Sequence, residues 1–390
     1  MNRLPVSIVK CENFYEEENV IQGVEEALEL IGGLREIVNP SDTVLLKPNF
    51  VTSKMSGTGA ITNSYVLKGL AKAAKKAGAK RIIIGESSFL GEDTEKAFQV
   101  NKLEEYFAGT RVELVDFKKD EYVTVPIETG KVVHNIKLPK TYLDADVVIN
   151  VPVLKTHDVF PVSLGMKNLK GVLRDTDKRR FHKLGLEQAV IDLNRVAMPD
   201  LVFYDGIIGM EGHGPIHGDP VELGVMIASR NILAAEMTAA NIMGFEKEEL
   251  PYLCKAEEQG LGCLDDIQIV GRKIQEVRKE FKRGKNVYDY LKQYDIKVYD
   301  EHACSKCKST LNSLILGNLE IFESIKGYTI CMGNIPEEVK NGSVDKDKLI
   351  LIGSCERNFA DGNCLYIPGC SPTQISLINT IKRKRNLSML

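Results

Sequence analysis

Short runs of β-branched residues alternate with segments of helical periodicity along the first part of the chain. Apolar runs of about 4 to 8 residues indicate buried strands, and a period of about 3.6 residues indicates helices. The predicted strands are 6–11, 43–46, 81–84 and 147–151, and the predicted helices are 20–37 and 65–77. This alternation predicts an α/β fold with mostly parallel strands and helices on both faces of the sheet.

The pattern continues with one antiparallel interruption. Two segments of alternating polarity within 122–140 flank Glu128-Thr129-Gly130-Lys131, which is typical of a hairpin turn. Further along, we predict helices at 186–196 and 232–243 and strands at 201–204 and 223–228. These elements extend the same α/β domain.

Residues 272–292 are dense in charge and poor in apolar side chains, which indicates a solvated connector at a domain boundary. A smaller α/β section follows it. Its predicted helices are 311–325 and 374–382, and its predicted strands are 328–331 and 349–352. We therefore divide the chain into an α/β domain (1–270), a charged connector (271–300) and a cysteine-rich domain (301–390).

The overall charge is close to neutral, with 51 basic and 54 acidic side chains in 390 residues. This balance provides no general field for nucleic acid or a membrane surface. Residues 1–10 lack the apolar run of a signal peptide, and no segment approaches about 18 consecutive apolar residues. We expect a soluble, cytoplasmic protein that binds neither nucleic acid nor membranes, and we leave a homo-oligomer open.

Six of the nine cysteines lie between residues 304 and 370. In a reducing cytosol, such crowding indicates metal binding or redox chemistry, with inert buried thiols as the alternative. The two-residue gap between Cys304 and Cys307 lets both thiolates bind one metal centre, and a glycine precedes the loop that carries Cys355 and directly precedes Cys370. Only one pair has the spacing of a zinc knuckle, so the pattern favours a [4Fe–4S] cluster over zinc.

The order Cys-x-x-Cys, Gly-Ser-Cys and Pro-Gly-Cys-x-Pro resembles the proximal-cluster motif of nickel–iron hydrogenase small subunits and the related complex I subunit. There, four cysteines hold a [4Fe–4S] cluster in a flavodoxin-like domain. The resemblance implies the ligands Cys304, Cys307, Cys355 and Cys370. Ser371 replaces the usual first proline of a Pro-Pro pair, and Cys331 and Cys364 are additional. Either additional cysteine could replace Cys355 or serve a second centre.

Polar residues follow several predicted strands of the first domain at the point where each strand ends. The segments are Lys47-Pro48-Asn49, Gly85-Glu86-Ser87-Ser88, Lys155-Thr156-His157 and Asp205-Gly206. In a doubly wound sheet these segments meet along one edge and form a cleft. The alternative for each of them is a solvated loop.

Residues 155–183 hold eight Lys or Arg against three Asp, and Gly165 and Gly171 lie within this stretch. Such a loop is suited to a carboxylate or phosphate, because lysines supply charge and glycines expose backbone N–H groups. A solvated basic face is the alternative. The candidate anion-binding residues are Lys47, Asn49, Lys155, Lys167 and Lys170.

Residues 211–220 form a glycine-rich segment with two histidines four residues apart. The glycines and prolines exclude a helix, so a zinc site from these two histidines is disfavoured. We interpret the segment as a lid or substrate loop that presents Glu211 and His213. Together with His157, these two residues are the candidates for acid–base catalysis.

Four segments look like the family called domain of unknown function 362, over about residues 5–245. They are Lys47-Pro48-Asn49, Asn150-Val-Pro-Val-Leu-Lys155-Thr-His157, Met166-Lys167-Asn168-Leu169-Lys170-Gly171 and Met210-Glu211-Gly212-His213-Gly214-Pro215. Members of this family are often linked to iron–sulfur modules, but the name supplies no reaction.

A more distant resemblance is to nickel-pincer lactate racemases. His157, Lys167 and His182 have the same order and similar gaps as a histidine, the cofactor-bearing lysine and a further histidine of those enzymes. This implies a racemase-like scaffold for small hydroxy acids or other carboxylates. Leu164-Gly165-Met166 replaces the flanking Gly-Gly-Arg, so we interpret Lys167 as an anion anchor.

Together, these features lead us to expect a cytoplasmic iron–sulfur enzyme, an oxidoreductase or lyase. Its small anionic substrate would bind between the α/β domain and a [4Fe–4S] cluster, and a redox partner protein could exchange electrons with it. The first alternative is a non-catalytic electron-transfer or metallocluster-assembly protein. The second is a racemase-like or isomerase-like enzyme whose cysteines are structural.

Overall fold

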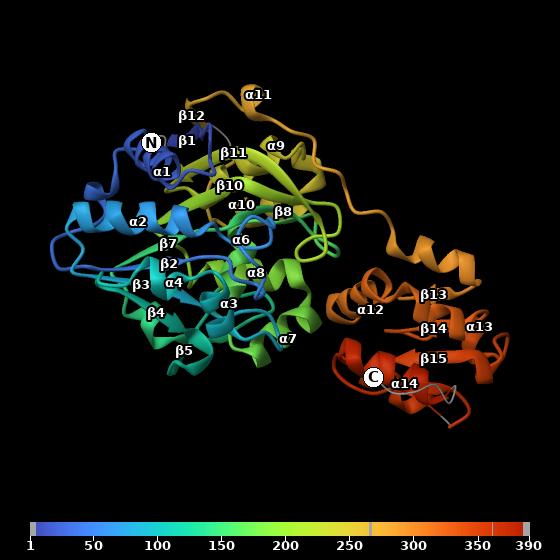
Figure 1. Ribbon diagram of the computed structural model, residues 1–390. Coiled ribbons are helices and arrows are strands. Elements are labelled where there is room, and N and C mark those ends of the chain that lie inside the picture. The colour runs from blue at the N-terminus through green and yellow to red at the C-terminus, as the bar shows by residue number, and fades with distance from the viewer. Residues whose placement is uncertain (1–4, 265–266, 361, 385–390) are drawn as a thin grey trace. The chain divides into compact units, whose positions relative to one another are not determined.

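The computed structural model describes residues 5–264, 267–360 and 362–384. Within these residues the chain forms two compact units, which Figure 1 colours mainly blue to yellow and mainly orange to red. The first unit runs to Lys178 and resumes over Glu187–Arg283. The second takes in Arg179–Leu186 and the chain from Gly284 onward. The division after Arg283 lies inside the predicted connector.

The first unit is built on a ten-stranded mixed sheet with the main order β12-β1-β11-β10-β7-β2-β3-β4. Its strands are β1 (Pro5–Lys10), β2 (Thr43–Lys47), β3 (Arg81–Glu86), β4 (Val112–Asp116), β7 (Val147–Asn150), β8 (Val153–Thr156), β9 (Val162–Ser163), β10 (Leu201–Glu211), β11 (Asp219–Ser229) and β12 (Gln268–Gly271). Pairing is parallel except for β1–β11, β10–β11 and β8–β9. The predicted α/β fold with mostly parallel strands is confirmed.

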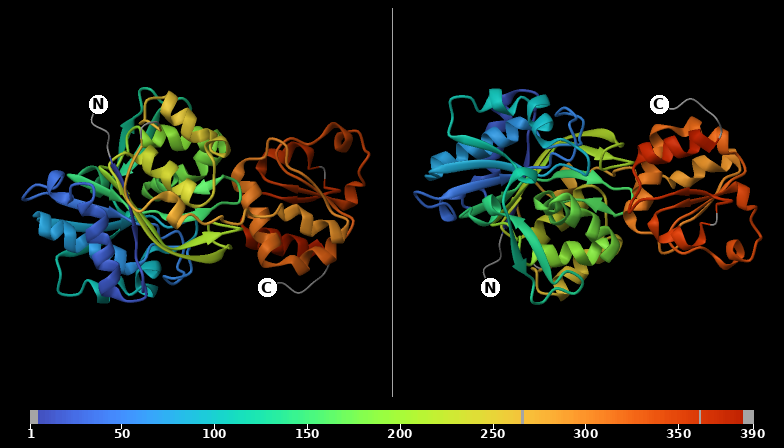
Figure 2. Two further views of the ribbon diagram at one scale, coloured as in Figure 1. Left: turned by 90° about the horizontal axis from the view of Figure 1, so that it is seen from above. Right: turned by 90° about the horizontal axis from the view of Figure 1, so that it is seen from below.

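Helices cover both faces of this sheet, with α1 and α2 on one face and α8, α9 and α10 on the other (Figures 1 and 2). The helices are α1 (Glu17–Glu29), α2 (Ser64–Ala77), α3 (Thr94–Val100), α4 (Leu103–Tyr106), α5 (Lys140–Leu143), α6 (Gly165–Asn168), α7 (Asp175–Leu184), α8 (Leu186–Asn194), α9 (Ile232–Ile242), α10 (Pro251–Glu258) and α11 (Ile274–Val277). Short 3₁₀ segments of this unit are η1 (Leu34–Glu36), η2 (Phe117–Lys119), η3 (Leu169–Val172) and η4 (Lys247–Glu249), whereas η5 (Val287–Tyr294) belongs to the second unit. None of the described helices is long and apolar enough to cross a membrane.

Most of the predicted elements occur close to their predicted bounds, including the hairpin β5 (Tyr122–Pro126) and β6 (Asn135–Pro139). The predicted helix 20–37 is wrong at its end. Helix α1 stops at Glu29, and Gly32 and Gly33 both adopt positive φ angles before η1. A helix requires negative φ throughout, so these glycines make a turn where apolar spacing alone predicts continuation.

The strands predicted at 201–204 and 223–228 are much longer and form one antiparallel hairpin, β10–β11. The glycines of β10 interrupt its apolar pattern, so the sequence predicts strands that are too short. A Cβ at Gly206 would lie 2.8 Å from both the Leu154 side chain and the Val225 carbonyl, and a Cβ at Gly209 would lie 2.7 Å from the Leu154 carbonyl. Strand β8 therefore packs closely against β10, and only glycine fits there.

The second unit contains a four-stranded parallel sheet of order β13-β14-β15-β16. Its strands are β13 (Lys297–Tyr299), β14 (Thr329–Cys331), β15 (Leu349–Ile352) and β16 (Leu365–Ile367), and its helical segments are α12 (Ser305–Gly317), η6 (Leu319–Ile325), α13 (Glu337–Lys340), η7 (Lys346–Lys348), η8 (Ser354–Phe359) and α14 (Gln374–Lys384). The helix predicted at 311–325 is two segments, α12 and η6. Strands β13 and β16 were not predicted.

Candidate functional site

A buried ion pair joins the carboxyl ends of β2 and β3. Lys47 Nζ lies 2.7 Å from Glu86 Oε2, and both side chains are almost completely buried. The same ammonium donates to the Pro48 carbonyl at 2.6 Å and lies 3.4 Å from Asn168 Oδ1. Burial lowers the pKa of Lys47, and the Glu86 carboxylate opposes this shift. Lys47 therefore has three acceptors, one of which is its counter-ion Glu86. It organises the site and has no N–H left over for a ligand.

Gly171 lets η3 approach this ion pair. A Cβ at Gly171 would lie 2.1 Å from Glu86 Oε1 and 2.3 Å from Lys47 Nζ. The Gly171 carbonyl accepts a hydrogen bond from the Ser87 backbone N–H at 2.8 Å. The segment 165–172 is thus held directly over the ends of β2 and β3.

Lys155 lies nearby on β8, but it has no carboxylate partner among the described residues. Its Nζ donates to Asn49 Oδ1 at 2.7 Å and to the Ala60 carbonyl at 2.8 Å, and its side chain is completely buried. Burial and then the positive charge of Lys167 place the pKa of Lys155 well below its ordinary value. An anion that reached Lys155 would relieve both effects.

The pairing of β8 with β9 brings Lys167 close to Lys155. Lys155 pairs with Ser163 in that ladder, so the two side chains project on one face. Lys167 Nζ lies 3.3 Å from Ser163 Oγ. Burial lowers the pKa of Lys167 to about 8, and Asp158 opposes the shift. The structure therefore brings two lysines with lowered pKa values together.

His157 follows β8 and lies two residues beyond Lys155. Its Nδ1 is 2.9 Å from Asp158 Oδ1 and accepts a hydrogen bond from the Val159 backbone N–H at 3.1 Å. Burial, the positive charge of Lys167 and a smaller contribution from Lys170 lower the pKa of His157 to about 4, although Asp158 opposes them. The imidazole is consequently neutral at physiological pH and is available as a base or a neutral donor.

The end of β10 and the loop that follows it carry the other two acid–base candidates, but these two residues have different surroundings. Glu211 accepts from the Lys282 backbone N–H at 3.0 Å, and its carboxylate lies 3.0 Å from Lys282 Nζ. It therefore fastens the end of the first unit to the hairpin. Burial lowers the pKa of His213, and the charge of Asp158 opposes the shift, so His213 lies within electrostatic reach of the residue beside His157.

Several residues of this network were not predicted as site residues. Asn150 and Asn168 link the strand ends through buried amides, and Lys178 donates to the Ser87 and Ser88 carbonyls, each at 2.7 Å. Glu236 accepts from Tyr252 and from the Met166 backbone N–H, at 2.7 and 2.6 Å. A usable signal existed in the sequence, because Glu236 is the single acidic residue of the apolar helix α9 and Asn150 ends an apolar strand.

In the second unit, the cysteine loops follow the carboxyl ends of three parallel strands. Cys304 is the N-cap of α12, and the Cys307 thiol and the backbone N–H groups of Lys306 and Cys307 donate to its sulfur. These bonds lower the pKa of Cys304 to about 6, as expected for a thiol at a helix N-terminus. The Cys304 thiolate in turn raises the pKa of Cys307, and Cys355 and Cys370 add to that rise. The four thiols therefore gather at one edge of the sheet.

Gly353 and Ser354 bring the last two cysteine loops together. Gly353 has a positive φ of 109°, and a Cβ there would lie 3.2 Å from Cys355 Sγ and 3.5 Å from Cys307 Sγ. The Ser354 backbone N–H donates to the Gly369 carbonyl at 3.0 Å, and the Gly369 N–H donates to Ser354 Oγ at 3.2 Å. The two loops are thus fastened to each other beside the thiols.

Cys331 and Cys364 face the other side of the same sheet. Ile330 and Met332 belong to the core with Cys307, whereas Cys331 packs with Cys364, Leu349 and Leu351. Side chains alternate between the two faces of a strand, so this division follows from the period of two residues. Neither thiol lies with the other four.

The four gathered thiols are a candidate ligand set for a metal centre. Among the described residues, no group of three or more His, Cys, Asp or Glu side chains could hold one metal ion as arranged. In a [4Fe–4S] cubane each thiolate binds a different iron atom, so its ligands stand farther apart than those of a mononuclear site. Cys304, Cys307, Cys355 and Cys370 would hold such a cluster.

A model of the family described as Domain of unknown function (DUF362) matches residues 44–241. The chain belongs to this family. A thylakoid-associated protein of Synechocystis sp. is 30% identical over 262 residues, which cover 66% of this chain and 79% of that protein. The predicted membership is confirmed, and the family description names no reaction.

Two solved structures resemble the chain at low TM-score. The lactate racemase apoprotein from Thermoanaerobacterium thermosaccharolyticum has a TM-score of 0.41 and 14% identity, over 61% of this chain and 57% of that chain. A protein from Thermotoga maritima has a TM-score of 0.36 and 12% identity, over 92% and 97%. Likenesses this weak carry no functional argument.

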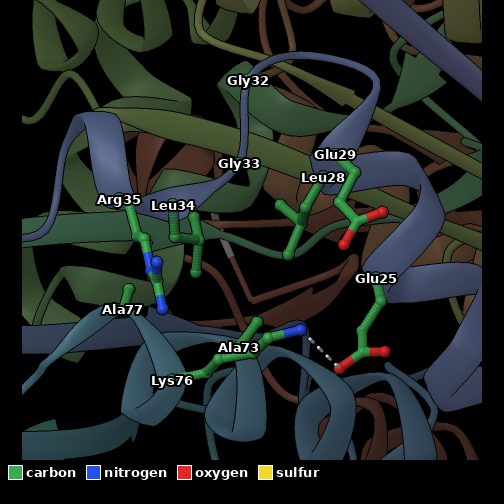
Figure 3. Close-up of a pocket in the computed structure, with 10 residues that line it drawn as sticks. All are labelled: Glu25, Leu28, Glu29, Gly32, Gly33, Leu34, Arg35, Ala73, Lys76 and Ala77. Carbon is green, nitrogen blue, oxygen red and sulfur yellow. Dashed lines mark ion pairs between the residues drawn. The ribbon is translucent and has the colours of Figure 1, made fainter.

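The DUF362 segment contains the whole polar network around Lys47, Lys155 and Lys167. A surface pocket of about 350 Å³ lies elsewhere in the first unit, between α1, α2 and the Gly32–Gly33 turn (Figure 3). Its charged lining includes Lys76 and Glu25, which form an ion pair of 3.8 Å. None of the predicted site residues lines that pocket, so the network around Lys155 and Lys167 remains the candidate site of the DUF362 domain.

Proposed function

We propose that this DUF362 protein is an iron–sulfur enzyme, a redox enzyme or a lyase, that acts on a small carboxylate or phosphate. The DUF362 domain would bind the anion through Lys155 and Lys167. The second unit would hold a [4Fe–4S] cluster through Cys304, Cys307 and Cys355, with Cys370 as the fourth ligand.

The observation that carries the anion site is the environment of Lys155. Its side chain is completely buried, and both of its acceptors are neutral oxygens, those of Asn49 and Ala60. A buried ammonium without a carboxylate is costly, because burial disfavours the charged form. Lys47, two residues before Asn49, is also buried, but its charge is compensated by an ion pair with Glu86. A bound anion would supply the missing counter-ion at Lys155.

The thiol arrangement supports the cluster. Cys304 already has a lowered pKa, which favours the thiolate that metals bind, and Gly353 leaves room beside the sulfurs of Cys355 and Cys307. When bound, a [4Fe–4S] cluster supplies single electrons or, with an open iron, a Lewis acid. His157 and His213 are two groups of this chain that could move a substrate proton.

Two measurements test the proposal. Anaerobically purified protein should contain about four iron atoms and about four sulfides per chain. Calorimetric titration of the protein with acetate, L-lactate, L-malate and inorganic phosphate should detect binding of at least one anion, and Lys155→Met should abolish it. Protein without iron and sulfide, or binding that is equal in Lys155→Met, would refute the corresponding half of the proposal.

An electron-transfer or cluster-assembly protein is the second candidate, and it is favoured by the exposure of Cys355 and Cys370. Exposed ligands allow electrons or a cluster to pass to a redox partner protein. This function needs the cysteines but not the lysines. If Lys155→Met and Lys167→Met keep the cluster and leave cellular function unchanged, the carrier is the better description.

A further inference from the structure

Three asparagine side chains form a continuous hydrogen-bonded chain that ends at Lys155. Asn150 Nδ2 donates to the Gly165 carbonyl at 2.9 Å, and Asn168 Nδ2 donates to Asn150 Oδ1 at 2.7 Å. Asn49 Nδ2 then donates to Asn168 Oδ1 at 2.7 Å, and Lys155 Nζ donates to Asn49 Oδ1 at 2.7 Å. We call Asn150, Asn168 and Asn49 the amide relay.

The direction of the amide relay is fixed at both ends. A carbonyl can only accept, so the Gly165 carbonyl requires the amino group of Asn150. An ammonium can only donate, so Lys155 requires the carbonyl oxygen of Asn49. Three amides that each donate toward Gly165 satisfy both requirements together. A single reversed amide would place two donors or two acceptors against each other in a buried site, which is costly.

The ends of the amide relay are themselves held. The Gly165 N–H donates to the Tyr204 hydroxyl at 3.2 Å, and a Cβ at Gly165 would lie 2.6 Å from that oxygen. At the other end, the Asn49 backbone N–H donates to Thr62 Oγ1 at 2.8 Å. Asn150 and Asn168 are both at most 5% exposed, so water does not compete for their amides.

We propose that Asn150 and Asn168 are positioning residues that act through Asn49 to hold Lys155 as a hydrogen-bond donor in the anion site. Two of the three N–H groups of the ammonium are directed to Asn49 and Ala60. The third has no acceptor among the described residues and is presented to the bound anion. This inference rests on the proposed anion site and adds the residues that orient it.

The amide relay also favours the charged form of Lys155. A fixed acceptor stabilises an ammonium, so it opposes burial and the repulsion from Lys167 and Lys47, as Glu86 also does. Breaking the relay frees the Asn49 amide to rotate and removes that acceptor. The pKa of Lys155 should then fall further, and anion affinity should fall with it.

The test compares two isosteric variants, Asn168→Leu and Asn194→Leu. Asn194 is also a buried asparagine, and it donates to the Met166 carbonyl at 3.0 Å, so it touches α6 but is outside the amide relay. Calorimetry with L-malate and inorganic phosphate measures affinity. A ¹³C NMR titration of the lysine Cε signals, with the Lys155 signal assigned by Lys155→Arg, measures the pKa.

We expect Asn168→Leu to weaken anion binding by about tenfold or more and to lower the pKa of Lys155, with neither change in Asn194→Leu. Equal effects in both variants, or no effect in Asn168→Leu, overturn the inference. If wild-type protein binds neither anion but Asn168→Leu still lowers the pKa, the positioning role stands and the proposed anion site fails. Asn150→Ala breaks the relay at its Gly165 end and replaces Asn168→Leu if that variant does not fold.

Discussion

Lys47 and Lys155 are both completely buried, yet their surroundings differ in one respect that decides their roles. Lys47 has a carboxylate 2.7 Å away, whereas the acceptors of Lys155 are an amide oxygen and a backbone carbonyl. A paired buried charge is tied to the fold, because removal of one partner leaves the other uncompensated. A buried charge without a counter-ion can instead be compensated by a bound ligand.

This difference predicts losses of stability of different size for the two variants. Lys47→Met should destabilise the first unit by about 3–5 kcal/mol, because Glu86 would remain as a buried, unpaired carboxylate. Lys155→Met removes only hydrogen bonds to neutral oxygens and also removes a buried amine, so its cost should be about 1 kcal/mol. Urea denaturation of both variants measures these values. A loss for Lys155→Met as large as that for Lys47→Met would show that Lys155 has a structural counter-ion.

The lowered pKa of Lys167 predicts how anion binding depends on pH. With a pKa of about 8, Lys167 is protonated below pH 8 and neutral above it. Anion affinity should therefore be retained at pH 7 and fall as the pH rises through about 8, by roughly tenfold per pH unit once Lys167 is deprotonated. Titrations from pH 6.5 to 9.5 measure the curve. In Lys167→Met this transition should be absent, and a transition at the same pH in that variant would assign it to another group.

At the scale of elements, the site depends on how closely η3 approaches the ends of β2 and β3. Gly171→Ala should destabilise the first unit by roughly 1–3 kcal/mol, because its Cβ would lie 2.1 Å from Glu86 Oε1 within a buried ion pair. Gly23→Ala in α1 is the matched control. Its Cβ would come closest to the flexible end of Met226, at 3.1 Å, and would make an ordinary contact with Cys11 at 3.7 Å, so thermal unfolding should change little. Equal losses would point to backbone effects and not to this approach.

The sequence predicts the elements well where the physics is local. Strands β2, β3 and β7 are apolar runs that end in polar residues, and their carboxyl ends do meet in the network around Lys47. The hairpin β10–β11 was underestimated because Gly206 and Gly209 interrupt its apolar pattern for reasons of packing against β8. The periodicity of a segment reports on one element, whereas the close packing of β8 against the hairpin β10–β11 involves three strands.

Contacts between elements also limit what the sequence predicts about the site. Lys155 and Lys167 could be chosen from the basic segment, but nothing in the sequence distinguishes the paired Lys47 from the unpaired Lys155. Glu211 illustrates the converse. The sequence makes it a candidate for proton transfer but does not show that its carboxylate contacts Lys282, which lies 71 residues away in the chain. Which acid meets which base is decided by tertiary contacts that a single sequence does not contain.

On the scale of the whole molecule, the two units gather two different kinds of side chain. The first gathers lysines and asparagines at the carboxyl ends of its strands, and the second gathers thiols at the corresponding edge of a smaller sheet. The proposed enzyme needs both sites, but each is built from residues of its own unit. Loss of the cluster should therefore leave anion binding in the first unit intact. Calorimetry of the double variant Cys304→Ser, Cys307→Ser tests this independence.

The two faces of the smaller sheet provide the sharpest test of the cluster. Replacing any one of Cys304, Cys307, Cys355 and Cys370 by serine should lower the iron and sulfide content of anaerobically reconstituted protein, because these thiols share one edge of the sheet. Cys331→Ala and Cys364→Ala are matched controls, since both thiols pack in the core on the opposite face. They should keep about four iron atoms per chain while losing some stability. Iron loss in Cys331→Ala without unfolding would instead place a ligand on that face.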